Sequence, residues 1–228
     1  DRAMEKFERA ATHDPSFAKP HFMLGQLHQI EYGSPGKAEE HYRKALQRDA
    51  DNPKYAYHLG TVLAEQEYHR EAVKYFNQAI ESRAGYAAAY YRLGESEVAR
   101  GNQPAAIRAY MDSIRADPRM KLGDQGTPGV AYHALGNLYL EYGFFDKALK
   151  VFENGIQNNP ESARLYHGRG VAQLELGRHE AAVQSFQRAV ERKQRYASAY
   201  FNMAAAYRAL GDRDEAIEAL ETFMENAG

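Results

Sequence analysis

The sequence predicts an all-α protein built from pairs of helices that recur about every 34 residues. Two columns of residues carry this repeat, and they stay in phase over almost the whole chain. One column is an alanine that an aromatic residue follows four positions later, as in Ala72 and Phe76. The other is a small residue: Gly25, Gly60, Gly94, Gly136, Gly170 and Ala204. Chance does not hold two columns in phase for so long, so a repeated supersecondary unit is indicated.

Each unit predicts a first and a second helix. In the first helix, apolar residues follow helical spacing around the small residue, as in Tyr90, Leu93 and Gly94. Glycines suited to a C-terminal cap with positive φ then end this helix: Gly101, Gly143, Gly177 and Gly211. The second helix carries the alanine and the aromatic residue. A proline ends three of the second helices, because it cannot continue a helix: Pro15, Pro118 and Pro160.

This pattern resembles the tetratricopeptide repeat, in which an aromatic residue, Leu-Gly, Ala, an aromatic residue, Ala and Pro recur over 34 residues. The segment AYYRLGESEVARGNQPAAIRAYMDSIRADP, from Ala89 to Pro118, matches it nearly throughout. The resemblance implies a right-handed α-solenoid, a single domain over residues 1–228, with six complete repeats after a half repeat. The expected bounds are 1–17 for the half repeat, then about 18–52, 53–86, 87–120, 129–162, 163–196 and 197–228, with a loop insertion at 121–128.

Four residues depart from the repeat pattern. Arg169 stands where leucine is usual, and Ala204 replaces the glycine. Glu97 and Gln173 occupy a column that is usually apolar. We expect these long side chains to extend along the surface and keep their polar ends in water.

The two ends of the sequence predict uncovered helices. The opening segment DRAMEKFERAATHDP is a second helix without its first. Near the other end, an apolar stripe is formed by Ala216, Leu220, Phe223 and Met224. Solenoid ends normally carry polar caps. We therefore expect a fragment of a longer chain, or ends that are covered by a capping helix, another domain or a second copy.

Adjacent aromatic residues recur in the first helices, although neighbours on a helix point about 100° apart. The first column is expected to pack on the second helix of its own unit: His21, Ala56, Tyr90, Tyr132, Tyr166 and Tyr200. The second column lies one residue further on: Phe22, Tyr57, Tyr91, His133, His167 and Phe201. In proteins that resemble this one, the first helices line a concave surface. The second column would then form a ladder of rings along an open groove, or each ring would pack sideways against the next first helix.

The predicted binding groove combines the second column with polar neighbours: Phe22, Tyr57, His58, Tyr91, Arg92, His133, Asn137, His167 and Phe201. Exposed aromatic rings on rigid helices are typical of protein-binding surfaces. We expect the partner to be a protein or peptide segment. It should present a polar or acidic stretch to the earlier repeats and an apolar stretch to the later ones.

Composition argues against several other functions. A formal net charge of −2 and a pI near 6.5 give no basic excess, so no nucleic-acid partner is expected. Without cysteine there is no disulfide, thiolate catalysis or cysteine-bound zinc. No catalytic motif is complete, and we predict neither enzymatic activity nor a cofactor or metal. No apolar run approaches the length of a membrane span. The compartment stays open between cytoplasm and periplasm.

Three functions are compatible with the sequence. The first is a non-catalytic scaffold that binds a peptide or protein segment in the concave groove. The second is the substrate-recognition arm of a larger enzyme, resembling the repeat arm of a protein glycosyltransferase, although only Asn202 falls at a place of its asparagine ladder. The third is a pilotin-like assembly lipoprotein of a secretin or pilus system. The lipid-bearing cysteine of such proteins is absent from residues 1–228 and would have to lie upstream of them.

Overall fold

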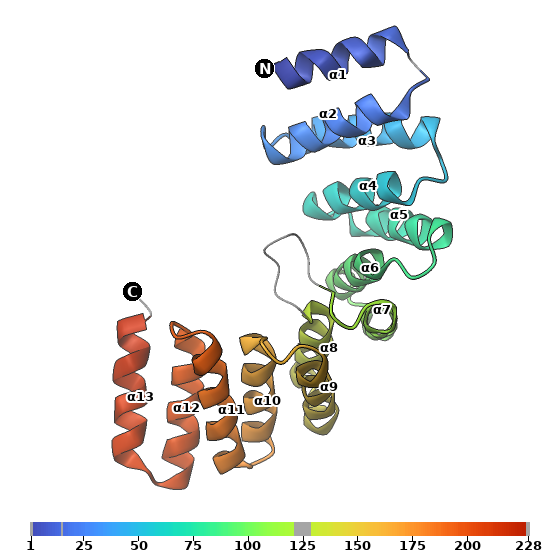
Figure 1. Ribbon diagram of the computed structural model, residues 1–228. Coiled ribbons are helices and arrows are strands. Elements are labelled where there is room, and N and C mark those ends of the chain that lie inside the picture. Colours follow the sequence, from blue (N-terminus) through green and yellow to red (C-terminus); the bar gives the residue numbers. More distant parts are fainter. Residues whose placement is uncertain (1, 15, 121–128, 227–228) are drawn as a thin grey trace. The chain divides into compact units, whose positions relative to one another are not determined.

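The computed structural model describes residues 2–14, 16–120 and 129–226. These residues form thirteen α-helices and no strand (Figure 1). The all-α prediction is therefore confirmed. The predicted loop insertion at 121–128 lies outside the described residues.

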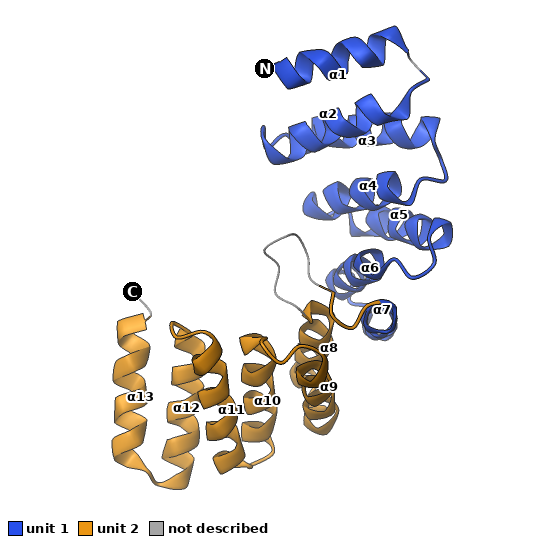
Figure 2. Ribbon diagram, viewed as in Figure 1, with its two compact units in different colours: residues 1–116 blue, residues 117–228 orange. Residues whose placement is uncertain are grey.

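The helices form two compact units, residues 1–116 and 117–228 (Figure 2). Unit 1 contains α1 (Arg2–His13), α2 (Ala18–Ile30), α3 (Pro35–Arg48), α4 (Pro53–Glu65), α5 (His69–Ser82), α6 (Ala87–Ala99) and α7 (Gln103–Ala116). Unit 2 contains α8 (Val130–Glu141), α9 (Phe145–Asn158), α10 (Ala163–Glu175), α11 (His179–Arg192), α12 (Ala197–Leu210) and α13 (Arg213–Asn226). Consecutive helices pack as six pairs after α1. That both units belong to one domain stays a prediction.

Within a pair, the glycine of the first helix lies directly against the ring of the second. A Cβ atom added at Gly94 would come 2.5 Å from Cε1 of Tyr110, well inside van der Waals contact. The same arrangement recurs in four other pairs: Gly25 with Tyr42, Gly60 with Phe76, Gly136 with Phe152, and Gly170 with Phe186. All five rings are buried. The glycine column is therefore required by close approach of the ring to the helix backbone.

The turn between the two helices of a pair uses the left-handed conformation. The predicted capping glycines adopt φ between +71° and +90°: Gly101, Gly143, Gly177 and Gly211. In the second repeat, Glu67 holds the equivalent position at φ 67°. A side chain in this conformation costs roughly 1–2 kcal/mol, which the surrounding packing offsets.

The polar departures are accommodated inside the helix pairs. Glu97 was expected to reach solvent, and this expectation was wrong. Its side chain is only 8% exposed, and both carboxylate oxygens accept hydrogen bonds from Arg100 at 3.0 Å. Arg169 and Gln173 meet at Ser185 of α11. The Ser185 hydroxyl accepts from Arg169 Nε at 2.9 Å and donates to Gln173 Oε1 at 2.5 Å.

We predict that Gly94→Ala lowers the free energy of unfolding by about 1–3 kcal/mol, because the methyl group overlaps the buried Tyr110 ring. Chemical denaturation measures this change. Gly36→Ala is the matched control, since Gly36 is also helical and a Cβ there meets nothing within 4 Å. The control should be neutral or stabilise by about 0.5–1 kcal/mol. Equal effects of both substitutions would show that the ring contact does not limit packing.

Candidate functional site

The second column lies beside the buried rings of the second helices. Phe201 is 53% exposed, and the other five residues of the column are half-buried. Four rings contact the aromatic residue of their own second helix, with these centroid distances: Phe22 to Tyr42 5.8 Å, Tyr57 to Phe76 6.2 Å, Tyr91 to Tyr110 5.7 Å and His167 to Phe186 5.7 Å. In these four pairs the column is thus anchored to the core and still reaches the surface.

Three of these rings also pack toward the next helix pair. The second contacts are Phe22 to Tyr55 at 4.9 Å, Tyr57 to Tyr86 at 5.1 Å and His167 to Tyr196 at 5.0 Å. Sideways packing, the second of the two sequence alternatives, therefore holds for these rings. Because each ring is only half-buried, the packing holds it in place and leaves part of it accessible. Sequence reasoning missed the tyrosine partners. For Tyr86 and Tyr196 the available signal was their place four residues before the first column.

In unit 1, the predicted polar residues His58 and Arg92 differ in charge. The His58 ring lies 5.1 Å from Phe22 and 5.6 Å from Tyr42. Burial, together with the charge of Lys54, lowers the pKa of His58 to about 4. It is therefore neutral at pH 7. Arg92 stays cationic, and its Nη1 pairs with Glu95 at 2.8 Å.

In unit 2, two imidazoles pair with asparagine amides. Asn137 Nδ2 lies 3.3 Å from His133 Nε2 within α8, and Asn202 Nδ2 lies 3.0 Å from His167 Nε2. Burial, with the charges of Arg164 and His167, lowers the pKa of His133 to about 4. Burial also lowers the pKa of His167. A neutral imidazole carries one donor and one acceptor, so this face suits amide groups better than carboxylates.

The structure divides the predicted site between the two units. Phe22, Tyr57, His58, Tyr91 and Arg92 belong to unit 1. The other four belong to unit 2: His133, Asn137, His167 and Phe201. In unit 1 the His58 ring lies 5.1 Å from Phe22 and 5.3 Å from Tyr57, and in unit 2 His133 lies beside Asn137. Asn202 was not among the predicted groove residues, but it contacts His167 and so belongs to the site. The sequence feature that could have indicated it is its place in the asparagine ladder.

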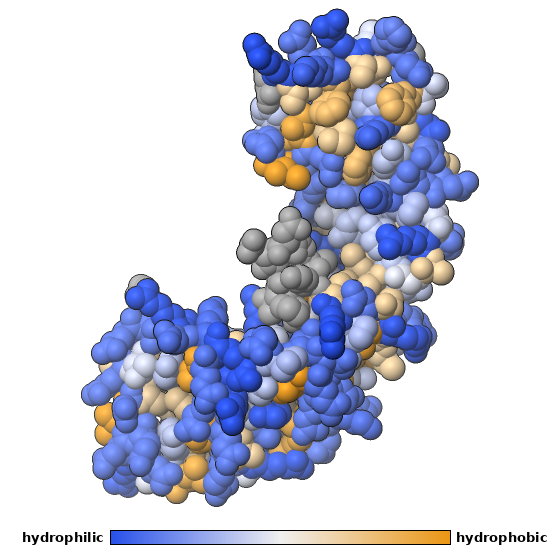
Figure 3. All heavy atoms as spheres, viewed as in Figure 1, coloured by the Kyte–Doolittle hydropathy of each residue, from blue (hydrophilic) through white to orange (hydrophobic). Residues whose placement is uncertain are grey.

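Other chemistry finds little support in residues 2–14, 16–120 and 129–226. No group of three or more His, Asp or Glu side chains is placed there to hold a metal ion. None of the helices in this part of the chain combines the length and apolar character that crossing a bilayer requires. The face of unit 2 in Figure 3 is mostly hydrophilic, with hydrophobic residues scattered singly.

Comparison with family models decides the relationship. A model described as "Tetratricopeptide repeat" matches residues 29–84, 57–120 and 133–200, and a second of the same description matches 198–227. The chain belongs to the tetratricopeptide repeat family. This family is generally a non-catalytic scaffold for protein–protein interaction.

Individual members of the tetratricopeptide repeat family resemble the chain more distantly. Human Superkiller complex protein 3 is 28% identical over 165 residues, which is 71% of this chain and 10% of that protein. The chain thus spans about a tenth of that relative. A tetratricopeptide repeat protein from Parabacteroides merdae superimposes with a TM-score of 0.72 at 17% identity, covering 93% of this chain and 80% of that one. YrrB, described as a TPR protein with an unusual peptide-binding site, gives 0.62 at 19% identity, covering 81% and 91%.

We predict that the protein loses stability as pH falls from 6.5 toward 4. Folding depresses the pKa of His58 and His133 from the ordinary 6.5 to about 4, so the unfolded state binds more protons within this window. Above pH 6.5 both states hold these imidazoles neutral, and their contribution is constant. The thermal midpoint of His58→Gln/His133→Gln, measured from pH 7 to 4.5, should fall less steeply than that of the unmodified chain. His13→Gln, on exposed α1, is the control. If the thermal midpoint of the double variant falls with pH as steeply as that of the unmodified chain, the lowered pKa values of His58 and His133 do not cause the loss of stability.

Proposed function

We propose that the chain is a non-catalytic scaffold whose second column binds a peptide or protein segment. The observation that carries this proposal is the half-exposed state of rings such as Tyr57, which is held between the buried ring of Phe76 and the half-buried ring of Tyr86. Such rings lose little conformational freedom on binding. Membership of the tetratricopeptide repeat family supports the class of function, and the printed description of YrrB supports a peptide as ligand.

The two units favour different parts of a ligand. In unit 1, Phe22, Tyr57 and Tyr91 lie in the same column, with the cation of Arg92 next to Tyr91. This arrangement suits apolar and polar groups, with carboxylates tolerated near the guanidinium. In unit 2, the neutral imidazole of His167 and the exposed ring of Phe201 belong to the same column, and they suit amides and apolar side chains. No basic surplus points to a phosphate backbone as partner.

The two alternative roles stay predictions. Asn202, at the single matching place of the asparagine ladder, is bound to His167 within the chain. Its amide is therefore partly used, and the enzyme-arm alternative gains no support from it. The pilotin alternative depends on a lipid-bearing cysteine upstream of residue 1.

We expect Phe201→Ala to weaken the binding of a peptide by about 2 kcal/mol if the ring is a hot spot. Because the ring is 53% exposed, the thermal midpoint should change little. The probe is a peptide selected from a random library on the unmodified chain, and calorimetry measures its affinity. Tyr91→Ala and His167→Ala should weaken binding and also destabilise, because these rings contact Tyr110 and Phe186.

The control is Tyr142→Ala, which removes a ring that is 40% exposed and lies outside the second column. It should leave the affinity within twofold, roughly the change expected for a non-contacting residue. If Phe201→Ala binds as tightly as the control, the second column is packing alone and the proposal fails.

The predicted C-terminal stripe is only partly open. Ala216 is buried, and the Phe223 ring packs against Phe201 at 5.4 Å. Leu220 and Met224 are exposed, as is the neighbouring Ile217. In α11 the positions equivalent to Ile217 and Leu220 are buried against α12: Val183 and Phe186. The α13 face thus continues a series of interfaces between adjacent helix pairs, and we propose that a second copy of the chain covers it.

Ile217→Glu/Met224→Glu should therefore shift the chain toward the monomer in sedimentation equilibrium. Both side chains are more than half exposed, so the substitutions should leave the fold intact. The control is Ile30→Glu, which places the same charge on an exposed apolar site in α2. A chain that is already monomeric at every concentration rules out self-association through α13.

A further inference from the structure

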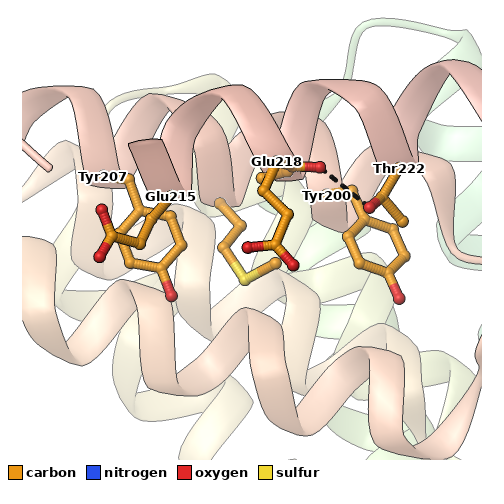
Figure 4. Close-up of a pocket in the computed structure, with 7 residues that line it drawn as sticks. Tyr200, Tyr207, Glu215, Glu218 and Thr222 are labelled. Atoms are coloured by element: carbon orange, nitrogen blue, oxygen red, sulfur yellow. Dashed lines mark hydrogen bonds between the residues drawn. The ribbon is translucent and has the colours of Figure 1, made fainter. Parts of the chain in front are cut away.

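A small hollow lies between α12 and α13, away from the second column. Its volume is about 140 Å³. It is lined by Tyr200, Met203, Tyr207, Glu215, Glu218, Ala219 and Thr222. Figure 4 shows the rings of Tyr200 and Tyr207 with Glu215 and Glu218 beside them. Tyr200 belongs to the first column, so it faces this hollow while the adjacent Phe201 packs on Phe223.

The floor and walls of the hollow are held by packing. Met203 is 8% exposed and Ala219 is 4% exposed, so the floor is part of the core. The Tyr207 hydroxyl accepts a hydrogen bond from Gln187 Nε2 of α11 at 3.3 Å. Three helices thus position two aromatic rings around a space that is wider than a methyl group.

The hollow carries negative charge without a partner. Within the described residues, neither Glu215 nor Glu218 forms an ion pair. The helix that bears them has five acidic residues and one basic residue: Asp214, Glu215, Glu218, Glu221 and Glu225 against Arg213. Aromatic faces bounded by carboxylates attract cations.

The preceding repeat shows what occupies the equivalent place. There Arg169 stands 34 residues before Met203, and its guanidinium lies 5.2 Å from the centre of the Tyr166 ring. Tyr166 is equivalent to Tyr200. A second guanidinium, that of Arg192, lies 4.1 Å from the same ring centre. In that repeat, two arginines of the chain itself occupy the place that is equivalent to the hollow.

The last repeat reverses these charges. Met203 replaces Arg169, and Asn226 replaces Arg192, so Tyr200 has no guanidinium at either equivalent position. Two neutral residues change in the opposite direction: Ala181 is equivalent to Glu215, and Gln184 to Glu218. Compared with the equivalent place in the preceding repeat, the hollow between α12 and α13 therefore lacks two arginines and has two additional carboxylates.

A similar hollow in the third repeat lacks this feature. It is lined by Tyr90, Leu93 and Glu97, among others. The Glu97 carboxylate is bound by Arg100. Asp112, also on its wall, pairs with Arg115 at 2.6 Å. Because both carboxylates are paired with arginines of the chain, this hollow is not expected to attract a cation from a partner.

We propose that the hollow between α12 and α13 binds an arginine side chain presented by a partner protein. The guanidinium lies in the hollow between the Tyr200 and Tyr207 rings and pairs with Glu218 in the middle and Glu215 at the Tyr207 end (Figure 4). It takes the place that Arg169 holds beside Tyr166 in the preceding repeat. Arginine is favoured over lysine because its planar group stacks on a ring and pairs with two carboxylate oxygens at once. This contact is separate from the second column and does not depend on it.

The test is a titration of the whole chain with the blocked peptide Gly-Arg-Gly, followed by NMR of the Met203 methyl group. Met203→Leu assigns that signal. The signal should shift saturably, and Glu215→Gln/Glu218→Gln should weaken binding about tenfold, equivalent to ~1.4 kcal/mol. The matched control is Glu221→Gln/Glu225→Gln, which removes the same charge from α13 outside the hollow and should leave the affinity nearly unchanged.

Two further measurements distinguish binding in the hollow from non-specific electrostatic attraction to α13. A peptide with citrulline in place of arginine keeps the shape and loses the charge, and it should not bind. Met203→Arg should fill the hollow with an internal guanidinium, as in the preceding repeat, and abolish binding while the fold persists. Equal binding of the citrulline peptide, equal weakening by the control pair, or full binding by Met203→Arg would each overturn the proposal.

Discussion

The close contact between a glycine backbone and an aromatic ring is the constraint on which the helix pairs depend. The contact places the ring of the second helix against the first helix, as Tyr110 lies against Gly94. The ring then lies within reach of the residue after the first column, and Tyr91 contacts it. The first-column residue, Tyr90, lines a hollow with residues of α7 instead. Because helix neighbours point about 100° apart, Tyr90 and Tyr91 lie on different sides of this contact.

Where the glycine is lost, the packing changes. The last pair has Ala204 in the glycine column and Leu220 in place of the ring. Leu220 is 41% exposed, whereas the five rings before it are buried. Phe201 of the second column finds another partner in Phe223. The last pair therefore differs from the others in its core contact, and also in the charge of its hollow.

Most of the fold could be predicted because the glycine and ring columns are steric requirements that any sequence with this packing must show. The site was less predictable because its contacts join residues from different repeats. His167 pairs with Asn202 from the next first helix, and no period in the sequence indicates a hydrogen bond. Glu97 was misjudged for a local reason. Arg100 lies one helical turn later and neutralises it, so burial is tolerated.

Positions that vary within the repeat carry the information about binding. In the hollow between α12 and α13, the residues that differ from their equivalents in the preceding repeat are the ones that point to a ligand. The change from Arg169 to Met203 removes a cation, and the change from Ala181 to Glu215 adds an anion at the same place. Met203 and Arg169 hold equivalent positions in successive helix pairs, one in a buried apolar cluster and the other bonded to Ser185. Two independent substitutions that favour the same external cation are more informative than the hollow alone.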